Sequence, residues 1–497
     1  MIGLFAALAL APAAFARTPS LTASGPIAQT EASHAFGAAA YTLKPETLSA
    51  RGFVEEEFFV GGKANVYDWP QAGPAMVRTA DVPYTTRVLV RRPSASAKFS
   101  GRVVVEMLNP SNLFDLNIGW AIHREELMRN GDAWVGITVK PVSMATLKAF
   151  DPQRYAGLAL PNPLRQADPL NCEVRAAGGD SRQTENGLAW DINTQVGGWI
   201  RSGAASNPFR YGGQASRARY LYAWGYSQTG GYLYTYINAI HPLVVKADGK
   251  SMFDGYFVAM SGGPTPINQC AQPLPQGDQR RVIGAVGVPV VHVMSQSDYL
   301  GFVPQRRADA DGQADRYRHY DLAGAGHATP DELYYAARSA DTAKGGRPVP
   351  AMDCNEGPRS RFPSAVPMNA ILRNLEAWVE RRAAPPPSQN IVVKDGAPML
   401  DSPRQRFGRR ALALPRRAHE HLVGQLHRPI LLLHRRSREA IRPGRAQGAL
   451  PYARRLCLGG AGQRSTPGAG AVSHARGWRC SLSRCQARGR ALGRVQP

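Results

Sequence analysis

The sequence contains no apolar run long enough to cross a membrane, and cysteine is scarce, with six residues among 497. A spanning helix needs about 20 consecutive apolar residues, so we predict no membrane span. Apolar residues still make up 43% of the chain, which is enough for a sizeable core and excludes a wholly disordered protein.

Lysine is missing from the C-terminal stretch 401–497, although the whole chain has a formal charge of +23. This stretch holds 21 arginines and 3 acidic residues, whereas residues 1–400 hold 39 basic and 34 acidic residues. A shifted reading frame in a GC-rich gene produces arginine without lysine, so we interpret 403–497 as a frame-shifted, disordered Arg-rich tail. It then indicates no nucleic-acid partner. The alternative is a genuine basic arm that binds polyanions.

The N-terminus has the pattern of an export signal. An apolar stretch from Leu4 to Ala14 is followed by Ala14-Phe15-Ala16, an A-x-A cleavage pattern. We predict a signal peptide over 1–16 and a periplasmic or secreted protein, with a buried N-terminal helix as the alternative. The globular domain is expected to span 17–402.

Export would permit disulfides, and the predicted domain contains Cys172, Cys270 and Cys354. Their spacing matches no zinc pattern, so we expect no metal site. A Cys270–Cys354 disulfide is our hypothesis, and three unpaired thiols are the alternative. The pattern predicts one bonded pair at most.

Short apolar runs alternate with helical patterns between residues 50 and 400. Strands are expected at 53–67 (as a pair turning at Gly61-Gly62), 86–91, 102–108, 133–139, 218–226, 253–260, 288–294 and 317–322. Helices are expected at 119–129, 185–201, 227–240 and 367–382. This alternation predicts an α/β fold with a mostly parallel sheet flanked by helices.

Residues 141–215 interrupt the alternation, because they are rich in proline and glycine and show only one good helix. A stretch of this kind within an α/β domain is typical of a lid or substrate loop, so we predict a lid-like insertion. Its apolar side chains suggest a bulky or apolar part of the substrate: Phe150, Tyr155, Leu158 and Leu160.

The most informative stretch is Trp224-Gly225-Tyr226-Ser227-Gln228-Thr229-Gly230-Gly231, which follows an apolar strand and opens a helix. A sharp strand–turn–helix lifts a serine hydroxyl above the sheet edge, and small residues beside the serine make room for the turn. The usual pattern is G-x-S-x-G, whereas Thr229 occupies the second glycine position here. We predict Ser227 as a nucleophile.

A nucleophilic serine needs a base, and the base needs an orienting acid, in the chain order serine, acid, histidine. Asp298 follows a predicted strand, and His327 follows a glycine-rich turn after the next one. We assign His327 as base and Asp298 as acid, and interpret His292 and His319 as strand residues without a catalytic part. The reserve acids are Asp309, Asp311 and Asp315.

The tetrahedral intermediate of acyl transfer needs two preorganised N–H donors. One is expected from the amide of Gln228, the residue after the nucleophile. The other is expected from the loop 108–112, in the region of Asn109, since Pro110 has no N–H. An ordinary turn is the alternative interpretation of that loop.

These residues resemble the bacterial secreted α/β-hydrolase-domain family with a G-Y-S-Q-T-G nucleophile elbow, which is more remotely similar to glucuronoyl esterases. The matching stretches are 53–59, 104–109, 133–136, 225–230 and 317–327. The resemblance implies an α/β-hydrolase fold and carboxylic-ester hydrolysis, with Ser227 as nucleophile and His327 as base. Members often have a glutamate beside the acid strand, where this chain has Gln296, which leaves the acid open.

The resemblance also bears on the tail. Codons for Arg404–Leu414 can be chosen so that the next reading frame encodes Gly-Asn-Ala-Leu-Gly-Gly-Val-Arg-Ser-Pro. Members of the family tend to continue with such a segment. This agreement favours the frame-shift interpretation over a basic arm.

We therefore predict an exported serine hydrolase that cleaves carboxylic esters through an acyl-enzyme, without cofactors or metal. Its partner is expected to be a small-molecule or polymeric ester. The alternatives are an amidase, a peptidase or a polyester depolymerase on the same triad, or a non-catalytic polymer-binding module. A binding module has no need of the Ser–Asp–His order. The sequence leaves the oligomeric state unknown.

Overall fold

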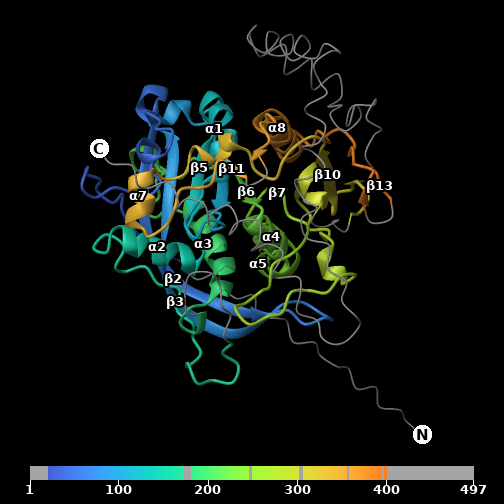
Figure 1. Ribbon diagram of the computed structural model, residues 1–497, viewed down its shortest axis with the longest axis horizontal. Helices are drawn as coiled ribbons and strands as arrows, with labels where there is room; N and C mark the ends of the chain where they lie inside the picture. Colours follow the sequence, from blue (N-terminus) through green and yellow to red (C-terminus); the bar gives the residue numbers. More distant parts are fainter. Residues whose placement is uncertain are drawn as a thin grey trace, which may run out of the picture.

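The computed structural model describes residues 21–172, 181–245, 249–300, 306–354, 357–394 and 397–399. In this part of the chain, ten strands form one central sheet in the order β1-β2-β3-β5-β4-β6-β7-β8-β10-β9 (Figure 1). Their bounds are Thr22–Ser24 (β1), Phe53–Asp68 (β2), Met76–Pro93 (β3), Arg102–Met107 (β4), Ala133–Ile137 (β5), Tyr220–Tyr226 (β6), Gly255–Ala259 (β7), Pro289–Ser295 (β8), Ala310–Asp311 (β9) and Arg316–Leu322 (β10). In the sheet order, the six consecutive strands β5-β4-β6-β7-β8-β10 pair in parallel, which confirms the predicted fold class.

Helices connect the parallel strands. The α-helices are Ile118–Asn130 (α1), Pro141–Phe150 (α2), Ala189–Arg201 (α3), Gln228–Thr235 (α4), His241–Val244 (α5), Pro330–Leu333 (α6), Ser339–Lys344 (α7) and Ala365–Arg381 (α8). A π-helical turn, Tyr236–Ile240, continues α4, and the 3-10 helix η9 covers Gln296–Leu300. Short strand pairs lie outside the sheet: Asp353–Cys354 (β11) with Gly357–Pro358 (β12), and Val393–Lys394 (β13) with Ala397–Pro398 (β14). No described helix is long and apolar enough to span a membrane.

Helices cover both faces of the sheet, as the alternation along β6 shows. Tyr222 and Trp224 are two residues apart in β6, so their side chains point to the same face. Trp224 packs near His123 of α1, and Tyr222 lies near Gly255 on the side where α8 packs. The helices α1 and α8 therefore cover the same face (Figure 1). Gly225 points to the other face, where a Cβ would lie 2.4 Å from the Thr229 carbonyl oxygen of α4. Both faces of these strands are therefore buried, which explains their nearly continuous apolar sequence.

The predicted turn at Gly61-Gly62 is wrong, because β2 is a single strand of 16 residues. Both glycines pair in register with β3, Gly61 with Thr85 and Gly62 with Tyr84. A Cβ on Gly62 would lie 2.7 Å from the Gln195 side-chain oxygen of α3. Glycine at this position therefore permits close packing of α3 on the strand, not a turn.

The segment 141–215 contains α2, which the sequence analysis missed, as well as the predicted α3. Its helix α3 belongs to the core: Trp199 packs edge-on against Phe58 of β2 at 5.2 Å, and Asp191 accepts hydrogen bonds from Asn65 and Tyr67. The side chains predicted to shape a substrate pocket are buried in the core as well: Phe150, Tyr155, Leu158 and Leu160. A lid role for this segment stays a prediction.

The disulfide hypothesis was wrong about the partner. Cys172 bonds to Cys270, with Cα atoms 5.5 Å apart. Neither Cys270–Cys354 nor three free thiols agrees with this pair. The bond joins the 141–215 segment to the loop after β7, two regions 98 residues apart in sequence, and spacing alone does not reveal such a contact. The predicted signal peptide and the tail 403–497 lie outside the described residues.

A buried glutamate fixes the start of α1. The Glu106 carboxyl group accepts hydrogen bonds from the backbone N–H groups of Gly119 and Trp120 and from the Trp134 indole at 2.7 Å. The first N–H groups of a helix have no partner within the helix, so a strand residue caps α1 here. Burial raises the pKa of Glu106 to about 8.

Glu106→Ala is expected to lower the free energy of unfolding by about 3 kcal/mol, because buried donors lose their acceptor. Since the folded pKa is raised, the stability that Glu106 contributes is present in full below about pH 4.5 and is lost as the pH rises through about 8. Urea unfolding at about pH 6 measures the effect. The control is Glu125→Ala, an exposed partner of Arg51, expected to cost less than about 1 kcal/mol. Equal losses in the two variants would contradict the capping role.

Candidate active site

Ser227 lies at the junction between β6 and α4, at the carboxyl edge of the parallel strands. Its backbone has φ 55° and ψ −116°, a conformation that side-chain-bearing residues rarely adopt. The Ser227 N–H donates to the Ala259 carbonyl at the end of β7, at 2.9 Å. The predicted strand–turn–helix setting is therefore present, with the turn anchored to the neighbouring strand.

The structure explains the threonine in the second glycine position of the motif. The Thr229 hydroxyl lies 3.2 Å from both the N–H and the carbonyl oxygen of Tyr226, and its side chain is buried. The residue that must be glycine is Gly230, because the Ala259 backbone lies so close that a Cβ would be 2.6 Å from the Ala259 carbonyl oxygen. Thr229 thus ties the turn together, while Gly230 lets α4 approach β7.

The fold brings the three predicted triad residues together from separate parts of the sequence. The Ser227 Oγ lies 2.8 Å from His327 Nε2, and His327 Nδ1 lies 2.5 Å from Asp298 Oδ1. Ser227 and Asp298 are each 6% exposed, whereas the His327 side chain is 35% exposed. This is the geometry expected of a nucleophile, a base and an acid, and the imidazole reaches solvent.

Asp298 is held by the strand that precedes it. Its Oδ2 accepts hydrogen bonds from the Ser295 hydroxyl at 2.7 Å and the Ser295 N–H at 3.0 Å, which leaves Oδ1 for His327. The reserve acids bind other partners: Asp309 accepts from Ser388, Asp311 pairs with Arg318, and Asp315 pairs with Arg307. Asp298 is therefore the acid that contacts His327.

Electrostatics couple the acid and the base. Burial lowers the pKa of His327, but the negative charge and hydrogen bond of Asp298 outweigh it, so the pKa is raised above its ordinary value. Burial raises the pKa of Asp298, but the His327 charge and hydrogen bonds outweigh it, so this pKa is lowered. The site thus favours an ionised Asp298 beside a histidine that protonates readily.

The raised pKa of His327 predicts the pH dependence of any reaction in which it acts as a base. We expect kcat/KM to fall as the pH drops through a midpoint above 6.5, because only the neutral imidazole accepts the serine proton. The Glu332 carboxylate also raises the pKa of His327, so Glu332→Gln should move the midpoint to lower pH. Rate profiles of both proteins measure this. A wild-type midpoint below 6.5 would contradict the prediction.

Of the two predicted oxyanion donors, Asn109 has another role. Its backbone N–H donates to the Leu116 carbonyl at 3.0 Å, so this N–H is not free to serve as the predicted donor. Its side-chain amide donates to the Tyr226 carbonyl at 2.7 Å and thus supports the turn that carries Ser227. Gln228 is the first residue of α4, and the first N–H groups of a helix have no acceptor within the helix. Its role as an oxyanion donor stays a prediction.

Two further residues support His327, and the sequence analysis missed both. The Tyr226 hydroxyl donates to the His327 carbonyl, although Tyr226 lies inside the motif between Gly225 and Ser227. Glu332 is buried, which raises its pKa to about 7, and it caps α6 just after His327. The sequence signal for Glu332 was the Thr329-Pro330-Asp331-Glu332 capping pattern.

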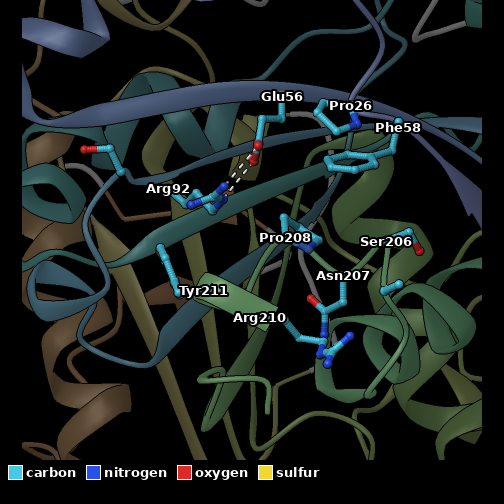
Figure 2. A pocket seen from close by; sticks show the side chains of 13 residues that line it. Pro26, Glu56, Phe58, Arg92, Ser206, Asn207, Pro208, Arg210 and Tyr211 are labelled. Carbon is cyan, nitrogen blue, oxygen red and sulfur yellow. Dashed lines mark hydrogen bonds and ion pairs between the residues drawn. The ribbon is translucent and has the colours of Figure 1, made fainter. Parts of the chain in front are cut away.

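A cavity of about 350 Å³ lies away from the triad (Figure 2). Arg92 lines the cavity. The preceding residue, Arg91, pairs with Trp134 at the amino end of β5. The cavity therefore lies toward the amino edge of the parallel strands, whereas Ser227 lies at their carboxyl edge. Arg92 makes two hydrogen bonds to Glu56 at 2.8 and 3.0 Å, and its guanidinium lies 4.9 Å from the Tyr211 ring. These groups bind one another, and none of the residues that line the cavity belongs to the predicted triad.

Comparison with known proteins agrees with this fold. The chain matches the family described as alpha/beta hydrolase domain over residues 23–410 and belongs to that family. The resemblance stated from the sequence is thereby confirmed for the family and the fold. No curated protein matches the sequence.

Several solved structures match parts of this chain at low identity. An alpha-beta serine hydrolase homologue from Coxiella burnetii shares 10% identity over 49% of this chain and 84% of its own, with a TM-score of 0.25. The esterase Est22 shares 10% identity over 59% of this chain and 79% of its own, with a TM-score of 0.29. The glucuronoyl esterase from Solibacter usitatus shares 10% identity over 43% of this chain and 48% of its own, with a TM-score of 0.21.

Proposed function

We propose that the protein is an exported serine hydrolase that cleaves carboxylic esters through an acyl-enzyme. The observation that carries the proposal is the continuous contact from Ser227 Oγ through His327 to Asp298, at 2.8 and 2.5 Å. Each member of the chain has the chemical type that its position requires: a nucleophile, a base and an acceptor that orients the base.

The reaction follows from the geometry. His327 Nε2 takes the Ser227 proton as Oγ attacks the ester carbonyl carbon, and the resulting imidazolium gives that proton to the departing alcohol oxygen. Water then attacks the acyl-enzyme with His327 as base, and the carboxylic acid leaves. Asp298 keeps a hydrogen on Nδ1, so that Nε2 presents its lone pair to the serine. The N–H of Gln228, at the positive end of α4, would stabilise the oxyanion.

Export is supported by the disulfide between Cys172 and Cys270. Disulfides persist in oxidising compartments and are rare in the cytosol, so this bond agrees with the predicted signal peptide. The proposed location is therefore the periplasm or the outside of the cell. Expression with the leader intact, followed by fractionation and N-terminal sequencing, tests this placement.

A fluorophosphonate probe tests the nucleophile, because it bonds covalently to an activated serine and leaves an unactivated hydroxyl unmodified. We expect one label per chain on the peptide that contains Ser227, together with hydrolysis of a short-chain p-nitrophenyl ester. A matched p-nitroanilide separates an esterase from an amidase on the same triad. A folded protein that takes no label and hydrolyses neither compound would refute the proposal and favour a binding module.

A further inference from the structure

Two buried histidines form a pair beside the acid of the triad. His292 of β8 and His319 of β10 lie opposite each other in the parallel register, and each is 1% exposed. Their Nδ1 atoms are 3.0 Å apart, and their rings meet edge-on. The sequence analysis interpreted both as strand residues without a catalytic part, and the triad does not use them.

Each outer nitrogen of the pair faces an acceptor. His292 Nε2 lies 2.7 Å from the Ser261 carbonyl oxygen, and His319 Nε2 lies 2.8 Å from Asp321 Oδ1. Asp321 also accepts from the Tyr299 hydroxyl at 2.6 Å, and its Oδ2 accepts from Arg306 and from the Ile391 N–H. So many donors around one carboxyl group require it to be ionised.

Counting hydrogens fixes the charge of the pair. A carbonyl oxygen only accepts, so His292 Nε2 must carry a hydrogen, and the Asp321 carboxylate requires another on His319 Nε2. The Nδ1–Nδ1 contact needs a hydrogen between its two nitrogens. A neutral imidazole has one hydrogen on nitrogen, so two neutral rings have two. The third N–H hydrogen makes one ring an imidazolium.

We propose that His292 and His319 share a buried positive charge that, through Asp321 and Tyr299, positions the catalytic acid Asp298. The inference rests on the proposed function only for its catalytic consequence. Tyr299 follows Asp298 directly in η9, so its bond to Asp321 fixes this turn of chain on β10. At the other end, Ser261 packs on Gly230, where a Cβ would lie 2.9 Å from the Ser261 Cβ. The network therefore bridges the serine turn and the acid loop.

The surroundings disfavour a full charge on His292. Burial and then the His319 charge lower the pKa of His292 to about 3. Burial raises the pKa of Asp321, but its bond to His319 and the nearby positive charges outweigh burial and lower it. The other titratable groups that face the pair are the hydroxyl of Tyr317 at 3.5 Å, the ring of Tyr234 and the more distant Asp298.

Nitrogen-15 NMR of the histidine-labelled protein tests the shared proton. We expect one doubly protonated ring in the pair at about pH 8, where an ordinary histidine with a pKa of about 6.5 is neutral. His319→Gln assigns the signal by removing it, and so separates it from His327. Two singly protonated rings at this pH would overturn the shared charge.

Tyr299→Phe tests the positioning role, because it removes one hydroxyl and keeps the ring. We expect kcat for the ester to fall about tenfold or more with little change in KM, since a misplacement on the order of 1 Å can cost about a hundredfold. The matched control is Tyr320→Phe, whose hydroxyl donates to the Pro386 carbonyl outside the network. Unchanged kcat in a folded Tyr299→Phe variant would overturn the role.

A second readout does not depend on activity. The proton on His327 Nδ1 lies in a 2.5 Å contact with Asp298 and should give a far-downfield proton signal. We expect this signal to move upfield or broaden in Tyr299→Phe and not in Tyr320→Phe. An unchanged signal overturns the positioning role, whereas a wild type with the signal but no hydrolysis refutes only the proposed function. If Tyr299→Phe does not fold, His319→Gln is the alternative variant, because it removes the imidazole that contacts Asp321. The same downfield proton signal of His327 measures its effect.

Discussion

Ser227→Ala is expected to lower kcat for ester hydrolysis by about 10⁴-fold or more and to abolish labelling by the fluorophosphonate probe. The serine oxygen lies 2.8 Å from His327 Nε2. It is the atom that would give its proton to His327 and form the bond to the acyl group. Alanine removes that oxygen and keeps the Cβ, so the turn and the circular dichroism spectrum should stay unchanged. Initial rates with a p-nitrophenyl ester measure the effect. A folded variant as active as the wild type would exclude Ser227 as nucleophile.

A second substitution at the same position separates catalysis from backbone strain. Ser227 has φ 55° and ψ −116°, which glycine adopts readily and residues with a Cβ do not. Ser227→Gly should therefore be as inactive as Ser227→Ala but more stable to unfolding by about 1 kcal/mol. Thermal or urea unfolding of the two variants makes the comparison. Lower stability of the glycine variant would show that the turn stores no strain.

Asp298→Asn is expected to lower kcat by about 10⁴-fold, a loss of the size known for this change in a serine protease triad. In this structure Oδ2 of Asp298 accepts two hydrogen bonds from Ser295, so the oxygen of asparagine should stay there. Its NH₂ group would then face His327 Nδ1 and force the ring hydrogen onto Nε2, toward Ser227. A protonated Nε2 cannot accept the serine proton.

Asp311→Asn is the matched control for Asp298→Asn. Asp311 was a reserve acid, its side chain is 57% exposed, and it pairs with Arg318 away from His327. We expect wild-type kcat within about twofold in this variant, because the Asp311 side chain lies largely in solvent and contacts Arg318, not His327. Rate profiles of both variants across pH complete the comparison. A loss in Asp311→Asn that matched Asp298→Asn would mean that the acid had been assigned wrongly.

Local sequence predicted the turn that carries Ser227 because that turn is built from consecutive residues. The strand before Ser227, the small residues of the turn and the helix after it are consecutive in the chain. The order of serine, acid and histidine followed from the strands that carry them. The same patterns placed β4, β5, β8 and α8 to within a few residues.

The errors share a different cause. The glycines of β2 suggested a turn because their packing against α3, more than 100 residues later, leaves no local signal. Likewise Asn109 suggested an oxyanion donor because its bond to Leu116 is not visible in the motif. Phe150 and Tyr155 suggested a substrate pocket because an apolar side chain looks the same in a core and in a cleft.

The sequence by itself determined the fold class, because hydrophobic periodicity depends on neighbouring residues. Its motifs resembled the family to which the chain belongs. It also predicted Ser227 as nucleophile and His327 as base, because a strand–turn–helix motif is local. Only the tertiary structure decided which cysteine bonds Cys172, which aspartate reaches His327, and that His292 lies against His319. These contacts depend on strand order and register, which place residues far apart in the chain within bonding distance. A charge on a buried histidine pair follows from such a contact and from nothing in the local sequence.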